Sequence, residues 1–215
     1  MSERYEIPPE RLDRWIGRWA DEHGGVVRTR AGAERVTLTA ADGAVLDCDP
    51  PFPPLPPGAR GERDGIELAG LLAHVTRDRV VGVLLVRLGG HAAGVFSGRR
   101  LVASKVDRPL VHGRHRKGGS SARRFERRRE GQAHISLERA ADVAARIILP
   151  HRPDLDAFVL GGDRRALGEV LEDVRLRPLR AITEERVLEV PEPRLQVLKA
   201  TPDAFRATTL HLRDA

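Results

Sequence analysis

Val80 to Asp107 reads VVGVLLVRLGGHAAGVFSGRRLVASKVD, and this stretch indicates the fold of the chain. Val80–Leu88 is an almost continuous apolar run, which is typical of a strand buried on both faces of a sheet. Short glycine-containing turns follow it and lead into two further β-type runs, Ala92–Ser97 and Leu101–Asp107. We therefore predict a meander of three strands joined by tight turns.

Helical and strand patterns alternate after this meander. Apolar residues recur at helical spacing over Leu137–Ile148, and Asp156–Leu160 has the pattern of another buried strand. Asp163 is expected to cap a helix that runs as far as Val174. Val187–Val190 is expected to add an edge strand. Strands that alternate with helices predict an α/β domain in which helices flank the sheet.

The N-terminal part has a different organisation. Pro8-Pro9 favours the start of a helix, and Asp42-Gly43 lies between two β-prone runs, which indicates a hairpin. Residues 50–57 read PPFPPLPP, and this proline content excludes a helix or a central strand and favours a stiff connector. We therefore predict a small α+β region at residues 1–58 and a second domain at residues 59–215.

Positive charge is concentrated in His112–Glu130, which reads HGRHRKGGSSARRFERRRE and has eight arginine and lysine residues. So many charges are almost never buried without partners, so the stretch is either a solvated face or a surface that meets phosphates. The net charge of +6 and its clustering favour phosphates, and we interpret the partner as RNA. The residues expected to contact RNA are Arg114, Arg116, Lys117, Arg123, Arg124, Arg127 and Arg128.

Other classes of protein fit the sequence less well. Cys48 is the only cysteine, so no intramolecular disulfide is possible and a reducing compartment fits. We find no apolar run of transmembrane length, so we expect a cytoplasmic monomer that does not bind membranes. His112 and His115 lack a cluster of further ligands, so no metal site is expected. We also expect no cofactor.

The order of these elements resembles a known family. Hairpin-linked strands, a basic Gly-Gly loop, an arginine-rich helix and a strand ending in Gly-Gly resemble the catalytic middle domain of eukaryotic and archaeal class 1 peptide-release factors. In that family the loop carries Gly-Gly-Gln, followed by Ser-Ala, arginine and phenylalanine. The corresponding string here is Gly118-Gly119-Ser120-Ser121-Ala122-Arg123-Arg124-Phe125, and the similarity covers about Arg79 to Val190. The whole chain is similar to the actinobacterial branch of the Vms-type tRNA hydrolases of ribosome quality control.

The resemblance implies both a fold and an activity. The fold would be a ribonuclease-H-like mixed sheet flanked by helices. The activity would be that of a peptidyl-tRNA hydrolase, which frees nascent chains from stalled ribosomes or large ribosomal subunits. The expected partners are therefore the large subunit and peptidyl-tRNA, and the expected catalytic residues are Gly118, Gly119, Ser120 and Ser121.

Ser120 stands where the family has glutamine. Gln132 is the only nearby glutamine, and along a helix it would lie about 18 Å from Ser120, too far to replace it. A backbone N–H at Ser120 can stabilise charge on an ester oxygen whatever its side chain, so we predict main-chain catalysis from Gly119 and Ser120. Two alternatives stay open, namely a ribosome-binding module without hydrolysis and a general binder of structured RNA.

Overall fold

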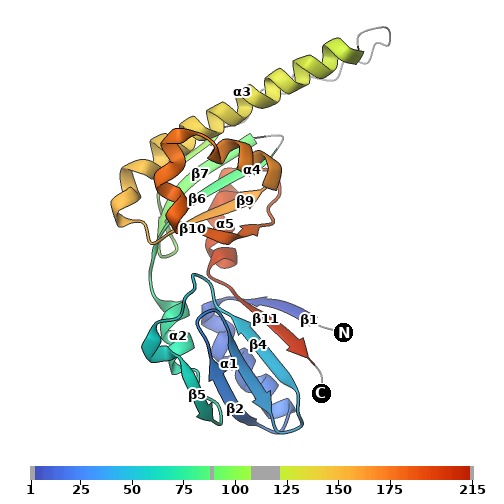
Figure 1. The fold of residues 1–215 in the computed structure, drawn as a ribbon, viewed down its shortest axis with the longest axis vertical. Coiled ribbons are helices and arrows are strands. Elements are labelled where there is room, and N and C mark those ends of the chain that lie inside the picture. Colours follow the sequence, from blue (N-terminus) through green and yellow to red (C-terminus); the bar gives the residue numbers. More distant parts are fainter. Residues whose placement is uncertain (1–2, 88–89, 108–121, 214–215) are drawn as a thin grey trace. The chain divides into compact units, whose positions relative to one another are not determined.

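The computed structural model describes residues 3–87, 90–107 and 122–213, with only the backbone described for residues 122–134. The chain divides into two compact units (Figure 1). The first unit comprises Met1–Asp78 and Pro202–Ala215, and the second comprises Arg79–Thr201. Each unit has a hydrophobic core of its own.

The first unit has a six-stranded antiparallel sheet in the order β1-β11-β4-β3-β2-β5. The strands are β1 (Glu3–Ile7), β2 (Val26–Ala31), β3 (Val36–Ala40), β4 (Val45–Asp49), β5 (Gly61–Asp64) and β11 (Thr208–Arg213). Helices α1 (Pro9–Glu22) and α2 (Ala69–Thr76) bury apolar side chains in the same core as this sheet. Leu12 of α1 and Leu38 of β3 are fully buried there.

Two N-terminal predictions are confirmed. Helix α1 begins at Pro9, where proline loses no intrahelical hydrogen bond. The expected hairpin is formed by β3 and β4, and Asp42 and Gly43 lie in its turn. Gly43 has a φ of +91°, and the Ala44 N–H donates to the Asp42 carboxylate over 3.0 Å. Asp-Gly therefore has the role in the turn that its chemistry predicts.

The boundary expected after residue 58 lies inside the first unit. Leu55 of the proline-rich segment is fully buried in the core of this unit, and Leu71 and Val75 of α2 pack in the same core. A short 3₁₀ turn, η1 (Pro57–Ala59), and β5 follow the prolines within that unit. The prolines connect two parts of one packed unit, and the change of unit falls between Asp78 and Arg79.

The second unit has a five-stranded mixed sheet in the order β10-β9-β6-β7-β8. The strands are β6 (Val80–Arg87), β7 (Gly90–Ser97), β8 (Arg100–Asp107), β9 (Ala157–Gly162) and β10 (Thr183–Leu188). The predicted meander is confirmed, since β6, β7 and β8 pair antiparallel in chain order. Strands β9 and β10 extend the sheet with parallel pairings, which gives the mixed α/β sheet that was expected.

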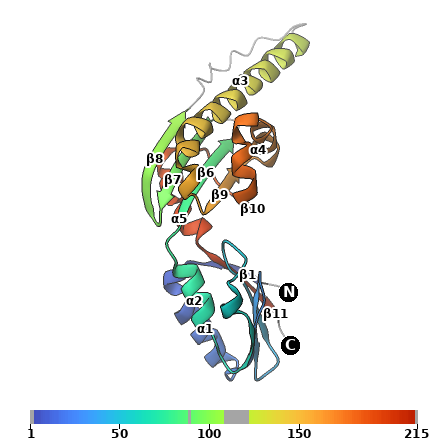
Figure 2. The same cartoon turned by 60° about the vertical axis from the view of Figure 1, so that its left-hand side comes forward.

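Helices lie on both faces of this sheet (Figure 2). On one face, α3 (Ala122–Ile148), η2 (Leu149–Asp154), α4 (Arg164–Leu171) and η3 (Val174–Ile182) surround the main core. A Cβ at Gly82 would lie 2.8 Å from a side-chain atom of Ile148 in α3, and one at Gly94 would lie 3.0 Å from Leu198 in α5 (Leu195–Phe205). Gly94 pairs with Val83, the neighbour of Gly82, so the two glycines face opposite sides. Helices α3 and α5 therefore pack on opposite faces.

The helix after β9 is capped as predicted, but it is shorter. The Asp163 carboxylate accepts a hydrogen bond of 2.9 Å from the Ala166 N–H at the start of α4. The expected end at Val174 is wrong, because α4 ends at Leu171 and Asp173 caps a separate 3₁₀ segment, η3. Two helical segments here therefore begin after an aspartate side chain that accepts a hydrogen bond from a backbone N–H group, namely Asp163 for α4 and Asp173 for η3.

Candidate functional site

The candidate site, Gly118 to Ser121, lies in the sequence between β8 and α3, and β8 ends at one edge of the sheet. Arg87 at the end of β6 pairs with Gly90, and Asp107 at the end of β8 pairs with His91 of β7. Gly162 at the end of β9 pairs with Val86. The carboxyl ends of β6, β8, β9 and β10 therefore lie at the same edge, which we call the loop edge. The backbone passes from Asp107 at the loop edge to Ala122 at the start of α3 through residues 108–121.

Helix α3 projects beyond the sheet at the loop edge (Figures 1 and 2). Among its described side chains, at residues 135–148, those of Ala140, Ala144 and Ile148 are buried and contribute to the core. At about 1.5 Å per residue, Ala122 lies about 27 Å along the helix axis from Ala140. The start of the helix is therefore held away from the packed body, and it directly follows the Gly-Gly-Ser-Ser stretch in the chain.

The structure does not test the predicted site residues. The following lie outside the described residues: Gly118, Gly119, Ser120, Ser121, Arg114, Arg116 and Lys117. The following lie in the first turns of α3, where the backbone alone is described: Arg123, Arg124, Arg127 and Arg128. At about 100° per residue, their spacing places these four positions within about 140° of the helix circumference. These four positions therefore share one side of the helix.

A buried histidine at the base of the loop was missed by the sequence-based interpretation. His91 is 1% exposed, and neither ring nitrogen has a hydrogen-bond partner among the described residues. Burial lowers the pKa of His91 from its ordinary value; the Asp107 carboxylate opposes this change, and Arg139 of α3 reinforces it. A lone histidine at the start of an apolar strand was the only signal in the sequence, and it does not reveal burial beside Asp107.

We expect His91 to make the stability of the second unit pH-dependent. Its pKa in the folded state lies below the ordinary 6.5, so below that pH the unfolded chain binds more protons than the folded chain. The free energy of unfolding should therefore fall as the pH drops from about 7 to about 5. In His91→Leu this fall should be smaller, as measured by denaturant titrations followed by circular dichroism at both pH values.

His151→Gln is the matched control for this measurement, because His151 lies in η2 and is half-buried rather than enclosed. It should keep the pH dependence of the unsubstituted protein. An identical pH dependence in His91→Leu and in the unsubstituted protein would contradict the assignment to His91.

Two further observations concern the described part of the chain. Its histidines, cysteine and carboxylates form no group of three or more that could hold a metal ion. None of its helices is both long enough and apolar enough to cross a membrane. The pair His112 and His115 falls outside the described residues.

Comparison with protein families gives a match over most of the chain. The model of the family described as Actinobacteria/chloroflexi VLRF1 release factor matches residues 79–211. Peptide chain release factor subunit 1 of Archaeoglobus fulgidus is 30% identical over 88 residues, which are 41% of this chain and 22% of that protein. The protein of the same name from Thermococcus onnurineus is 34% identical over 83 residues, or 38% of this chain and 20% of its own length. The chain thus spans about a fifth of these relatives.

The chain also matches solved structures, at lower sequence identity. The crystal structure of the archaeal translation termination factor aRF1 is 16% identical, with a TM-score of 0.45 over 93% of this chain and 73% of that chain. The crystal structure of Archaeoglobus fulgidus Pelota is 13% identical, with a TM-score of 0.32 over 95% of this chain and 63% of that chain.

Proposed function

Because this chain belongs to the Actinobacteria/chloroflexi VLRF1 release factor family, we propose that it hydrolyses peptidyl-tRNA and so releases nascent chains from stalled ribosomes or large ribosomal subunits. The observation that carries this proposal is the family match over residues 79–211, which includes the whole second unit up to Thr201. That unit contains the basic stretch, the loop edge and α3.

The geometry of α3 supports this proposal. The ester of a ribosome-bound peptidyl-tRNA lies in a confined cavity, so a protein catalyst must reach it with a narrow extension. The start of α3 lies about 27 Å along the helix from Ala140, the first buried side chain among residues 135–148 of this helix, whose side chains the structure describes. Gly118 and Gly119 precede this helix in the chain, and glycine lets a main chain come close to a substrate.

The proposed chemistry uses the main chain. When water attacks the ester, negative charge develops on the carbonyl oxygen and on the departing ribose oxygen. Backbone N–H groups at Gly119 and Ser120 are the proposed donors to this charge, and they do not depend on the missing glutamine side chain. Ser120, which also carries a hydroxyl, and Ser121 are next to these donors along the sequence. The ribosomal RNA and the tRNA complete the site in this proposal.

The arginines at the start of α3 have a separate proposed role in holding RNA. Arg124→Ala should weaken binding to ribosomal complexes and lower the salt slope of the affinity by about one, because one phosphate contact is lost. Co-sedimentation at several salt concentrations measures both quantities. Arg146→Ala, in the last turn of the same helix, is the matched control and should change neither. If Arg124→Ala leaves affinity and salt slope unchanged, Arg124 does not face RNA.

A module that binds ribosomes without hydrolysis is the second candidate, and Ser120 in place of glutamine is the observation that favours it. Release of labelled peptide from stalled ribosomal complexes separates the two candidates. Binding without release would establish the module. Failure to co-sediment with ribosomes or large subunits would exclude both and favour a binder of other structured RNA.

A further inference from the structure

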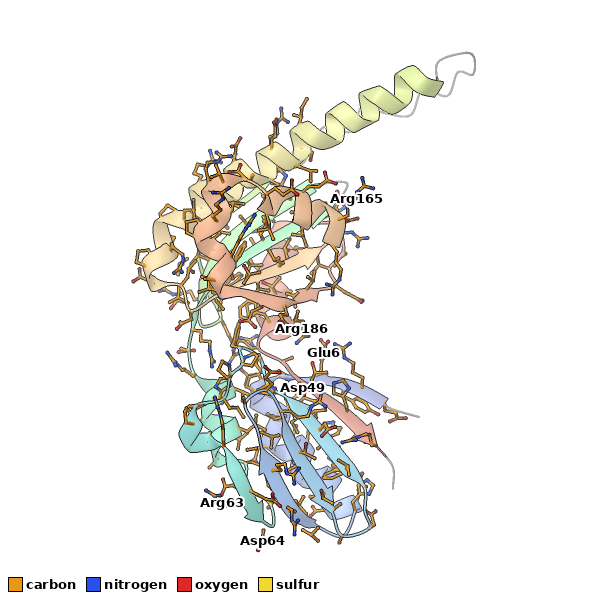
Figure 3. All side chains as sticks on the ribbon, viewed as in Figure 1. Glu6, Asp49, Arg63, Asp64, Arg165 and Arg186 are labelled. Carbon is orange, nitrogen blue, oxygen red and sulfur yellow. The ribbon has the colours of Figure 1, made fainter. Side chains whose placement is uncertain are left out.

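An open cavity of about 630 Å³ lies at the loop edge of the second unit. It is lined by Arg87, Gly162, Asp163, Arg164, Arg165, Glu189, Val190 and Pro191. These residues come from the end of β6, the end of β9 with the start of α4, and the segment after β10. Figure 3 labels Arg165 on this side of the unit, the side past which α3 projects.

Two interactions hold the walls of this cavity in place. The Nη1 of Arg87 donates to the Val190 carbonyl over 2.7 Å, so the guanidinium joins the end of β6 to the segment after β10. The Asp163 N–H donates to the Val86 carbonyl over 2.8 Å, which ties the residue before α4 to the end of β6. The cavity is thus built by contacts between elements that are distant in sequence.

The charges of the cavity favour an anion. Three arginines and two carboxylates line it. One of these carboxylates, that of Asp163, already accepts a hydrogen bond of 2.9 Å from the Ala166 N–H. Arg165 is 92% exposed and pairs with Glu169 over 3.2 Å, so it can turn towards a stronger partner at little cost. In the described part of the chain, Arg164 has no ion-pair partner. Guanidinium groups bind phosphate through parallel hydrogen bonds, which suits this arrangement.

We propose that this cavity binds a phosphodiester of an RNA backbone, as a second RNA contact distinct from the arginines at the start of α3. The inference rests on the proposed function for the presence of RNA at the loop edge. An RNA that meets the projecting half of α3 passes the same edge of the sheet, where Arg87, Arg164 and Arg165 lie. The cavity contributes affinity and orientation, and it takes no part in the chemical step.

The test compares two exposed arginines of the same sheet-containing unit. Arg164→Gln removes a cavity charge, whereas Arg100→Gln removes an equal charge at the opposite end of the sheet, where Arg100 pairs with Ser97. The probe is the stalled large-subunit complex with bound peptidyl-tRNA, and the full chain is titrated between about 50 mM and about 200 mM salt. Arg164→Gln should weaken binding about fivefold and lower the salt slope by about one, and Arg100→Gln should change neither.

A double variant shows whether the two RNA contacts are separate. Arg124→Ala combined with Arg164→Gln should weaken binding by the product of the two single fold-changes, because distant and independent contacts add in free energy. Equal effects of Arg164→Gln and Arg100→Gln would overturn the proposal, since the loss would then reflect net charge alone. No effect of Arg164→Gln on affinity or salt slope would overturn it as well.

The maximal rate of peptide release separates this inference from the proposed function. Arg164→Gln should raise the protein concentration at half-maximal release and leave the maximal rate unchanged. If the unsubstituted protein binds the complex but releases no peptide, the proposed hydrolysis is wrong. The affinity difference between Arg164→Gln and Arg100→Gln still shows in that case whether the cavity binds RNA. A lower maximal rate with unchanged affinity would overturn the cavity's role as a binding site.

Discussion

Gly119→Ala is expected to lower the rate of peptide release from stalled ribosomal complexes by about 10²–10³-fold, whereas Ser120→Ala should retain most of the activity. In the proposed mechanism, a methyl group at Gly119 would obstruct the close approach of the main chain to the ester, so the donors would no longer reach the developing charge. Ser120→Ala keeps the backbone N–H and loses only the hydroxyl. The measurement is single-turnover release of labelled peptide at saturating protein.

Ser120→Pro makes the main-chain hypothesis sharper, because proline removes the N–H group itself. It should lose about as much activity as Gly119→Ala. Co-sedimentation of each variant with the complex controls for lost binding, and circular dichroism controls for lost structure. Equal losses in Gly119→Ala and Ser120→Ala would contradict main-chain catalysis and would assign the chemistry to the serine side chain.

The largest loss of stability is expected for Gly162→Ala, which should destabilise the second unit by about 3 kcal/mol or more. Gly162 has a φ of +106°, a conformation that side chains disfavour, and a Cβ there would collide with the Val86 carbonyl of β6. Gly162 of β9 pairs with Val86 of β6, so relief of this collision would separate the two strands where α4 begins. Gly162 also lines the cavity at the loop edge.

Gly168→Ala is the matched control for this substitution. Gly168 lies in α4, and a Cβ there would meet nothing within 4 Å. In a helix this change should stabilise the unit by about 0.5–1 kcal/mol. Both tryptophans, Trp15 and Trp19, lie in α1 of the first unit, so their fluorescence follows that unit while circular dichroism follows both. Gly162→Ala should move the circular dichroism transition to lower denaturant; an unshifted transition would contradict the collision.

The sequence by itself determined the local elements of the second unit. The apolar run of β6 and the helical spacing of Leu137–Ile148 are properties of neighbouring residues, and the structure confirms the strand and the helix that they predicted. The candidate loop is also a property of the sequence alone, since Gly118 to Ser121 are identified by their motif and by the charges around them. The structure adds the elements on either side of this stretch, namely β8, which ends at Asp107, and α3, which begins at Ala122.

Only the tertiary structure decided which distant segments meet. Strand β11 pairs with β4, and no local pattern shows this, because a strand finds its partner through a free edge elsewhere in the fold. Strand β1 has exposed or half-buried side chains throughout and lacks the alternation that marks a strand. The domain boundary also depends on packing between distant elements, and so does the burial of His91 beside Asp107. The same is true of the cavity that Arg87 and Arg164 both line. Periodicity reports how one segment is buried, whereas the identity of its neighbour depends on the shape and register of the whole sheet.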